Sequence, residues 1–313
     1  MSRRGWVLFL LMCVIWGIPY LLIKVAVEDM SPATLVLART AVASLLLVPI
    51  ALARGQVGPV LRRWGPLLAF ALIEICLPWW LLGFAEQRLS SSLTGLLVAA
   101  VPLVGAVLAR YAPGHERLDR RRVAGLLVGL AGVAALVGFE VEGGDARAVV
   151  AVAVVAVAYA VGPILLARYL ADLPGLGVVA VSLLLAAVLY VPAGVAQAPD
   201  GWPPVEAVLA VVALSVICTA VAFLVFFRLI AEVGPARSTV ITYVNPAVAV
   251  VLGVAVLDEA FTVATAAGFA LILLGSVLAT ARNRPARVPL PAARSRGGRD
   301  VECGSMPQAV AEP

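Results

Sequence analysis

Ten runs of apolar residues, each close to 20 residues long, dominate this chain of 313 residues. A helix needs about 20 apolar residues to cross a hydrocarbon layer about 30 Å thick. Isolated strands cannot satisfy their backbone groups in lipid, and the runs lack the alternation of a β-barrel strand, so we expect membrane-spanning helices. We expect them at about Trp6–Val27, Pro32–Ala53, Trp64–Phe84, Ser91–Ala112, Val123–Phe139, Ala148–Leu170, Gly175–Ala196, Pro204–Leu229, Ala236–Leu257 and Thr262–Ala281.

The composition also indicates an integral membrane protein. Hydrophobic residues make up 63% of the chain and charged residues 13%, about half the charged share of a typical soluble domain. The mean hydropathy is +1.05. The four cysteines form no C-x-x-C pair, and His115 is the single histidine, which leaves little material for a metal site or a catalytic triad. We therefore expect no metal, no cofactor and no enzymatic activity.

Positive charges lie on alternate loops of the expected helices. One side carries 19 of the 23 lysine and arginine residues, whereas the acidic residues gather on the other side. The positive-inside rule then places both termini in the cytoplasm of a multi-pass protein of the plasma (inner) membrane. The same rule explains the net charge of +5 without a nucleic-acid partner. We expect residues 283–313, which have no apolar period, to form a disordered cytoplasmic tail near membrane lipid.

Both halves of the chain contain the same pattern of a proline, a glutamate and two glycines. The first copy is Pro102, Glu116, Gly125 and Gly132, and the second is Pro246, Glu259, Gly268 and Gly275. In each copy the glycines follow the glutamate by 9 and 16 residues. We interpret the prolines as helix bends, the glutamates as caps of the following helix, and the glycines as sites of close helix contact within each repeat.

Each half holds five spans, an odd number, so the second half enters the membrane upside down relative to the first. We expect an all-α fold of ten transmembrane helices built as two inverted five-helix repeats. The domains would be residues 1–140, residues 141–282 and the tail. Inverted repeats of this kind are typical of secondary transporters that alternate access around a central site.

Several short motifs resemble the drug/metabolite transporter superfamily, and specifically its ten-helix EamA-type members. These motifs are W-G-I-P-Y at 16–20, L-A-R-T ending at Thr40, A-A-V-P-L at 99–103, H-E-R-L at 115–118, and Y-V-N-P-A-V-A-V-V-L-G followed by L-D-E-A-F-T from Tyr243. The resemblance extends from about Trp6 to Ala281. Tyr159 stands where many members have tryptophan, and Asp258 where glycine is usual. The resemblance implies movement of a small metabolite, usually export, through a cavity between the two halves.

Two charged residues lie well inside the expected spans, where an unpartnered charge is costly. Arg39 belongs to the second span and Glu74 to the third. They are either a structural ion pair between these helices, or Glu74 is a titratable group that binds a substrate amine or a proton. Lys24, near the end of the first span, is expected to extend to the membrane interface.

Aromatic and polar side chains inside the spans complete the candidate substrate site. They suit an apolar or amphipathic solute, or a cation that stacks on ring faces. Plain helix packing is the alternative for each single ring, and Asn245 is an alternative partner for the backbone broken at Pro246. The candidate substrate-binding residues are Trp16, Tyr20, Glu74, Trp79, Thr94, Tyr159, Phe223, Tyr243 and Asn245.

These observations predict a secondary transporter, in the exporting direction, of amino acids or other amphipathic metabolites. No G-x-x-x-x-G-K loop is present, so a gradient would supply the energy. A lipid or lipid-carrier flippase is the alternative within the same architecture. An intramembrane enzyme or a receptor scaffold is not supported by the residues present. We expect a monomer whose partners are a small-molecule solute and membrane lipid.

Overall fold

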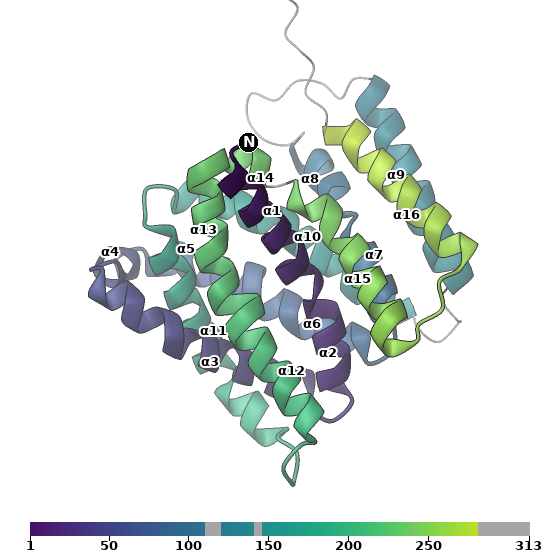
Figure 1. Ribbon diagram of the computed structural model, residues 1–313. Coiled ribbons are helices and arrows are strands. Elements are labelled where there is room, and N and C mark those ends of the chain that lie inside the picture. Colours follow the sequence, from purple (N-terminus) through teal and green to yellow (C-terminus); the bar gives the residue numbers. More distant parts are fainter. Residues whose placement is uncertain (110–119, 141–145, 239, 281–313) are drawn as a thin grey trace, which may run out of the picture. The chain divides into compact units, whose positions relative to one another are not determined.

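Helices account for the regular structure throughout the described part of a computed structural model (Figure 1). The structure describes residues 1–109, 120–140, 146–238 and 240–280, so His115, Glu116 and the tail lie outside the described residues. The first half contains α1 (Arg3–Gly17), α2 (Pro19–Val27), α3 (Pro32–Ala53), α4 (Val57–Leu61), α5 (Trp64–Phe70), η1 (Ala71–Cys76), α6 (Leu77–Glu86), α7 (Ser91–Val98), α8 (Val101–Ala109) and α9 (Arg120–Glu140). The second half contains α10 (Ala146–Tyr169), α11 (Gly175–Ala196), α12 (Val205–Ser215), η2 (Val216–Val221), α13 (Ala222–Val233), α14 (Pro235–Ser238), α15 (Ile241–Leu257) and α16 (Val263–Thr280).

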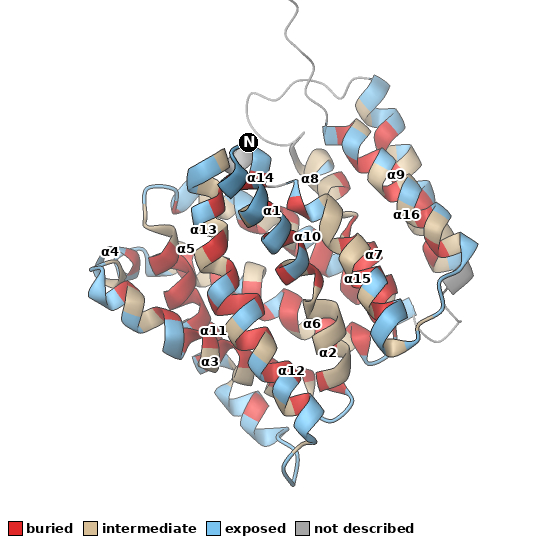
Figure 2. Cartoon of the chain, in the orientation of Figure 1, coloured by how far each residue is buried: buried red, intermediate tan, exposed pale blue. Residues whose placement is uncertain are grey.

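The expected all-α membrane fold is confirmed. Nine helical spans of the described chain are long and apolar enough to cross a membrane, and α15 adds a shorter apolar helix of 17 residues. We expected this ninth span to begin near Ala236, but the short helix α14 precedes α15 there. Large apolar side chains are exposed on the outer helix faces, as lipid contact requires (Figure 2).

Serine side chains cap the starts of several helices. Ser31 accepts a hydrogen bond from the backbone N–H of Thr34 at the start of α3, at 3.1 Å. Ser90 accepts one from Leu93 at the start of α7, also at 3.1 Å. A serine hydroxyl at this position satisfies a backbone donor that the helix itself leaves free. The turn residues between the apolar runs therefore determine where the helices begin.

Corresponding helices of the two halves pack against each other. The pairs are α3 with α11, α7 with α15, and α9 with α16, and each joins one helix to its counterpart in the other repeat. The contact of α6 with α10 is likewise matched by contacts of α12 with α2 and of α13 with α1. This arrangement is what a two-fold relation between inverted repeats produces.

The paired glycines bring α9 and α16 into close contact. A Cβ atom on Gly125 would lie 2.5 Å from the backbone nitrogen of Ala279 and 2.8 Å from the carbonyl oxygen of Gly275. A Cβ atom on Gly132 would lie 2.8 Å from the carbonyl oxygen of Gly268. We expected these glycines to serve contacts within each repeat, but they pack between the repeats, because the fifth helix of each half lies against its counterpart.

Several spans are interrupted near their middle. The first span breaks between α1 and α2 at Pro19, which lacks a backbone N–H. The fourth breaks between α7 and α8 close to Pro102, whereas Pro246 lies inside the continuous helix α15. The third and eighth spans each contain one π-helical segment, η1 and η2, at corresponding places in the two repeats. Such single-turn π segments are frequent at functional sites.

Candidate functional site

Side chains from five spans form a polar group inside the bundle, which we call the central cluster. It consists of Tyr20 (α2), Arg39 (α3), Glu74 (η1), Trp79 (α6), Tyr159 (α10) and Thr219 (η2). Five of these six residues were predicted from the sequence. Both π-helical segments contribute one member, and each contributes the fourth of its six residues.

Arg39 is fixed by two contacts and is only 6% exposed. Its Nε donates to the hydroxyl oxygen of Thr219 at 3.0 Å. Its guanidinium carbon lies 3.6 Å from the centre of the Trp79 ring, a cation–π contact. The two terminal nitrogens make no hydrogen bond to any described residue.

Glu74 does not form the expected ion pair with Arg39. The one ion pair between described residues joins Arg63, which directly precedes α5, to Asp172, which follows α10, at 2.7 Å. Glu74 Oε2 is buried and has no hydrogen-bond partner. The carboxyl group lies against Gly162 of α10, where a Cβ atom would be 2.8 Å from Glu74 Cδ. Arg39 is instead attached to Trp79 and Thr219, so neither Arg39 nor Glu74 forms an ion pair with a described residue.

Tyr159 is a neighbour of both charged residues. It is close enough to both Glu74 and Arg39 to interact electrostatically, and its hydroxyl faces the Trp79 side chain. Tyr20 is similarly close to Arg39 and Tyr159. The cluster thus places a cation, a carboxyl group and two phenol hydroxyls around one region inside the membrane-spanning part.

Aromatic rings extend the cluster towards α1 and α13. The Trp16 ring centre lies 4.7 Å from that of Phe226 and 5.9 Å from that of Phe223. Phe223 also packs against the apolar core that contains Trp79 and borders Tyr159. The predicted residues Trp16 and Phe223 therefore belong to the same connected set of rings as the central cluster.

The remaining predicted residues have other neighbours. With its amide group in the orientation that satisfies both side-chain atoms, the nitrogen of Asn245 donates to the carbonyl oxygens of Cys13 at 3.2 Å and Ile241 at 2.9 Å, which joins α15 to α1. The hydroxyl of Tyr243 lies 2.9 Å from that of Thr280 on α16. Thr94 is fully buried in α7, and its hydroxyl has no hydrogen-bond partner. None of these hydrogen bonds reaches the central cluster.

Sequence reasoning missed Thr219 and Glu86. Thr219 is uncharged and therefore did not stand out from its apolar span. An alignment of the two repeats would have indicated it, because Thr219 in η2 corresponds to Glu74 in η1. Glu86 was assigned to a loop because the third span was expected to end at Phe84. The structure continues α6 to Glu86 and buries that side chain completely.

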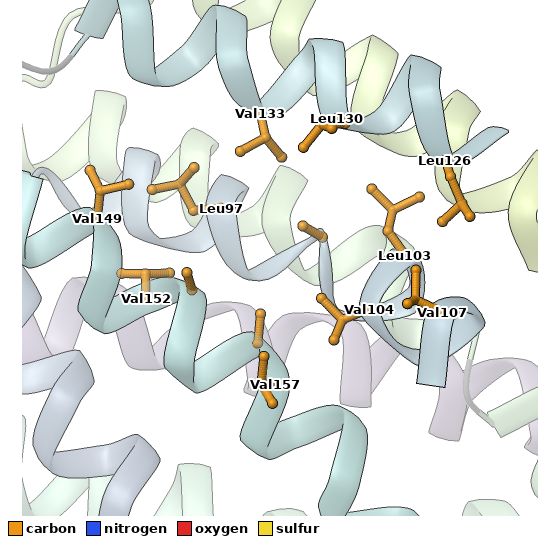
Figure 3. A pocket seen from close by; sticks show the side chains of 13 residues that line it. Leu97, Leu103, Val104, Val107, Leu126, Leu130, Val133, Val149, Val152 and Val157 are labelled. Carbon is orange, nitrogen blue, oxygen red and sulfur yellow. The ribbon is translucent and has the colours of Figure 1, made fainter. Parts of the chain in front are cut away.

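A separate apolar cavity of about 360 Å³ lies between α7, α8, α9 and α10 (Figure 3). Its thirteen lining residues are leucines, valines and alanines, among them Leu97, Leu103 and Val152. None of them belongs to the central cluster. The cavity offers no hydrogen-bonding side chain, so it suits hydrocarbon.

Comparison with known proteins identifies the family. The model of the EamA-like transporter family matches residues 3–138 and again residues 146–281. The chain belongs to this family. The two matches also show that the chain contains the family domain twice. It is a multi-pass membrane transporter, as predicted from its motifs.

Several known proteins are similar to this EamA family member over most of its length. "Uncharacterized inner membrane transporter YedA" of Escherichia coli K12 is 29% identical over 274 residues, which cover 85% of this chain and 87% of that protein. A "Probable terminal-alkyne amino-acid exporter" of Streptantibioticus cattleyicolor is 30% identical over 300 residues, which cover 90% of this chain and 95% of that protein. A solved crystal structure of a protein, 26% identical, gives a TM-score of 0.65 and covers 90% of this chain and 98% of that chain. The location in an inner membrane agrees with the first of these names.

Proposed function

We propose that this protein is a secondary transporter that exports amino acids or similar small amphipathic metabolites by alternating access between its two repeats. The paired packing of corresponding helices supports two repeats that move against each other. The name of the Streptantibioticus relative supports both the direction and the class of solute. The charge pattern of the loops supports cytoplasmic termini, and we expect the protein to act as a monomer.

The separation of Arg39 from Glu74 is the observation that carries this proposal. Two opposite charges inside a membrane normally pair, because an uncompensated buried charge is costly. Here Arg39 keeps two free nitrogens and Glu74 keeps a free carboxyl oxygen, with Tyr159 near both. A zwitterion supplies a carboxylate for the guanidinium and an ammonium for the carboxyl group, and the surrounding rings contact its apolar part.

Glu74 is also the group most suited to couple transport to protons. It is the one carboxyl group of the central cluster, and it has no cation beside it. In this role it would bind the substrate amine and a proton alternately, which would exchange one for the other across the membrane. A Glu74→Gln variant would then lose the dependence of transport on a pH gradient.

A lipid or lipid-carrier flippase is the second candidate, and the apolar cavity favours it. The cavity lies among membrane-spanning helices and is lined by hydrocarbon alone, so an acyl chain fits its chemistry. A flippase would also need a path for the polar headgroup, for which the central cluster is the candidate. Scrambling of fluorescent lipids in vesicles separates this candidate from solute export.

Efflux from proteoliposomes tests the proposed solute class. The vesicles would hold an apolar amino acid, its methyl ester, which lacks the carboxylate, or its N-acetyl derivative, which lacks the ammonium group. We expect Arg39→Gln to reduce efflux of the two carboxylate-bearing solutes and to spare the ester. We expect Glu74→Gln to reduce efflux of the two amine-bearing solutes and to spare the N-acetyl acid.

Each loss should be large, because a hydrogen bond to a charged group contributes about 1.5–3 kcal/mol, which is roughly a 10- to 100-fold change. Arg88→Gln is the matched control, since Arg88 also stacks on a ring, that of Phe84, but is exposed. Protein-free vesicles measure the passive leak. Equal effects of Arg39→Gln on the amino acid and its ester would contradict the assignment of Arg39 to the carboxylate.

A further inference from the structure

A second polar group lies at one end of the bundle, where the two repeats meet, and we call it the gate cluster. It consists of Lys24 (α2), Glu86 (α6), Ser91 and Ser92 (α7), and Glu259, which follows α15. The first four belong to the first repeat and Glu259 to the second. The central cluster shares none of these residues, so the proposed substrate site does not account for them.

Glu259 binds the start of a helix in the other repeat. One carboxylate oxygen accepts from the backbone N–H of Ser91 at 2.7 Å, and the other accepts from that of Ser92 at 2.9 Å and from the Ser92 hydroxyl. We expected Glu259 to cap its own next helix, α16, but it caps α7 instead. A carboxylate at this place is stabilised by free N–H groups and by the helix dipole.

The loop that carries Glu259 has a shape suited to this contact. Asp258 adopts a left-handed backbone conformation with φ of 53°, and the Glu259 N–H bonds to the carbonyl oxygen of Gly253 at 3.1 Å. Gly253 is buried, and a Cβ atom there would collide with the Glu259 carboxylate and the Ser92 hydroxyl. The second repeat therefore presents Glu259 on a compact turn that leaves room for α7.

Lys24 makes a second link at the same end. Its Nζ donates to the backbone carbonyl oxygen of Glu86 at 2.7 Å and to that of Leu89 at 3.2 Å. These carbonyls belong to the C-terminal end of α6, where a cation is favoured. Lys24, which we expected to extend to the membrane interface, thereby joins α2 to α6.

The Glu86 side chain is the charged member of the gate cluster that has no hydrogen-bond partner, and the Ser91 hydroxyl also has none. Glu86 is completely buried, and neither carboxyl oxygen accepts or donates a hydrogen bond. The charged and titratable groups near it are Lys24 and Tyr20 of α2, Arg39 of α3 and Glu259. The ammonium of Lys24 is directed to backbone oxygens, and Glu259 adds a negative charge. An ionised Glu86 would thus be a buried carboxylate without a single donor, which is strongly unfavourable.

Helices α2, α6 and α7 contact one another at this end of the bundle. By the relation between the repeats, their counterparts at the other end are parts of α10 and α13 and the segment formed by α14 and the start of α15. Among the described residues, α13 contacts α14, but α10 makes no comparable contact with either of them. Helix α2 is therefore joined more closely to its neighbours at the gate cluster than α10 is at the opposite end.

We propose that the gate cluster is a proton-controlled latch between the repeats, in which Glu86 binds a proton when the gate is closed and releases it to water when the gate opens. The Glu259 contact with α7 keeps the gate shut. Loss of the proton places a carboxylate beside Glu259 without donors and favours opening. This inference rests on the alternating-access part of the proposed function, but on neither the substrate nor the role of Glu74.

Thiol labelling of Cys218 reports opening of the gate. Cys218 is 2% exposed and lies near Arg39 of the central cluster, so a reagent from the gate side reaches it only when the gate opens. The background protein carries Cys13→Ser, Cys76→Ser and Cys303→Ser. A membrane-impermeant thiol reagent is added to vesicles from the side of the gate cluster.

A second background, with Trp202→Cys as the single cysteine, gives the reference for each labelling rate. Trp202 is 95% exposed in the connection between α11 and α12, on the same face of the membrane as the gate cluster. Its labelling verifies which face the reagent reaches and corrects for the change of thiol reactivity with pH. The quantity to compare is the ratio of Cys218 labelling to this reference.

We expect the ratio to rise at least fivefold between pH 6 and pH 8 in the background protein. Glu86→Gln should keep it low at both pH values, and Glu259→Gln should make it high at both. Glu28→Gln is the matched control, because Glu28 is an exposed acid beside the same end of α2, and it should behave as the background protein.

A Glu86→Gln variant that keeps the full pH dependence would overturn the assignment of the proton to Glu86. An unchanged ratio in Glu259→Gln would overturn the latch. The labelling needs no substrate, so a failure of the amino-acid panel leaves it intact. Equal labelling of Cys218 from both faces in every variant would instead contradict alternating access itself.

Discussion

Glu74 occupies space on the surface of α10 that a methyl group would otherwise fill. The absence of a side chain at Gly162 lets the carboxyl group lie directly against the helix backbone. The position of the Glu74 carboxyl group therefore depends on Gly162, which belongs to another span. This dependence makes the glycine a sensitive test of the site.

We expect Gly162→Ala to displace the Glu74 carboxyl group and to reduce efflux of amine-bearing solutes nearly as much as Glu74→Gln does. The added Cβ atom would lie 2.8 Å from Glu74 Cδ, which is too close for the observed geometry. Efflux of the amino acid and of its N-acetyl derivative from proteoliposomes measures the effect. Gly105→Ala on α8, where a Cβ atom meets open space, is the control. Unchanged efflux in Gly162→Ala would mean that the position of the carboxyl group does not matter for transport.

Single residues could be predicted from the sequence where they contrast with their surroundings. Glu74 and Arg39 were evident because charges are rare in apolar spans, but their separation was not, since it depends on the Trp79 ring and the Thr219 hydroxyl from two other helices. Glu86 was missed because α6 extends two residues beyond the expected end at Phe84. This extension places Glu86 inside the bundle rather than in a loop. Three-dimensional neighbours, rather than local sequence, decide these cases.

At the scale of helices, α9 and α16 depend on glycine for their contact. Backbone atoms of the two helices approach where Gly125, Gly132, Gly268 and Gly275 face one another. Small residues allow such an approach, and van der Waals contact then stabilises the pair without help from the hydrophobic effect. The sequence indicated the purpose of these glycines but not the partner helix.

Gly125→Ala should destabilise the protein by about 1–3 kcal/mol, the usual cost of overpacking a close contact. The new Cβ atom would meet the backbone nitrogen of Ala279 at 2.5 Å. Thermal unfolding in detergent, followed by circular dichroism, measures the loss. Gly138→Ala on the same helix is the control, since its Cβ atom has open space and alanine favours the helix. Equal unfolding temperatures for both variants would contradict the close contact.

Whole spans were predictable because the hydropathy of a membrane helix is a local property. The ends of the apolar runs gave most of the boundaries, and the structure places serine caps at two of them, at the starts of α3 and α7. The π-helical segments were not predicted, and the side-chain hydrogen bonds at them are of two kinds. In η2 the Thr219 hydroxyl donates to the carbonyl oxygen of Leu214 in the same span, whereas η1 receives its bond from a packed neighbour. The Tyr190 hydroxyl donates to the carbonyl oxygen of Cys76 from a different helix.

At the scale of the molecule, the distribution of charge predicts the orientation in the membrane. Arginine residues are concentrated in alternate connections of the expected helices, and acidic residues in the others. The energetic preference for positive residues on the cytoplasmic side then predicts cytoplasmic termini. The gate cluster would accordingly lie on the outer side.

Thiol labelling of intact cells tests this orientation. We expect native Cys303, in the tail, to react with an impermeant maleimide only after the membrane is permeabilised. A cysteine introduced by Trp202→Cys in the exposed α11–α12 connection should react in intact cells. The reverse pattern would place the termini outside and the gate cluster on the cytoplasmic side.

The pairing of corresponding helices has a consequence for biosynthesis. Helix α7 is made and inserted early, but the carboxylate that binds Ser91 and Ser92 follows 168 and 167 residues later in the chain. Helix α9 likewise exposes its glycine-lined face until α16 leaves the ribosome. The first repeat must therefore remain in the membrane incomplete, so we infer that final folding waits for the end of translation rather than proceeding one repeat at a time.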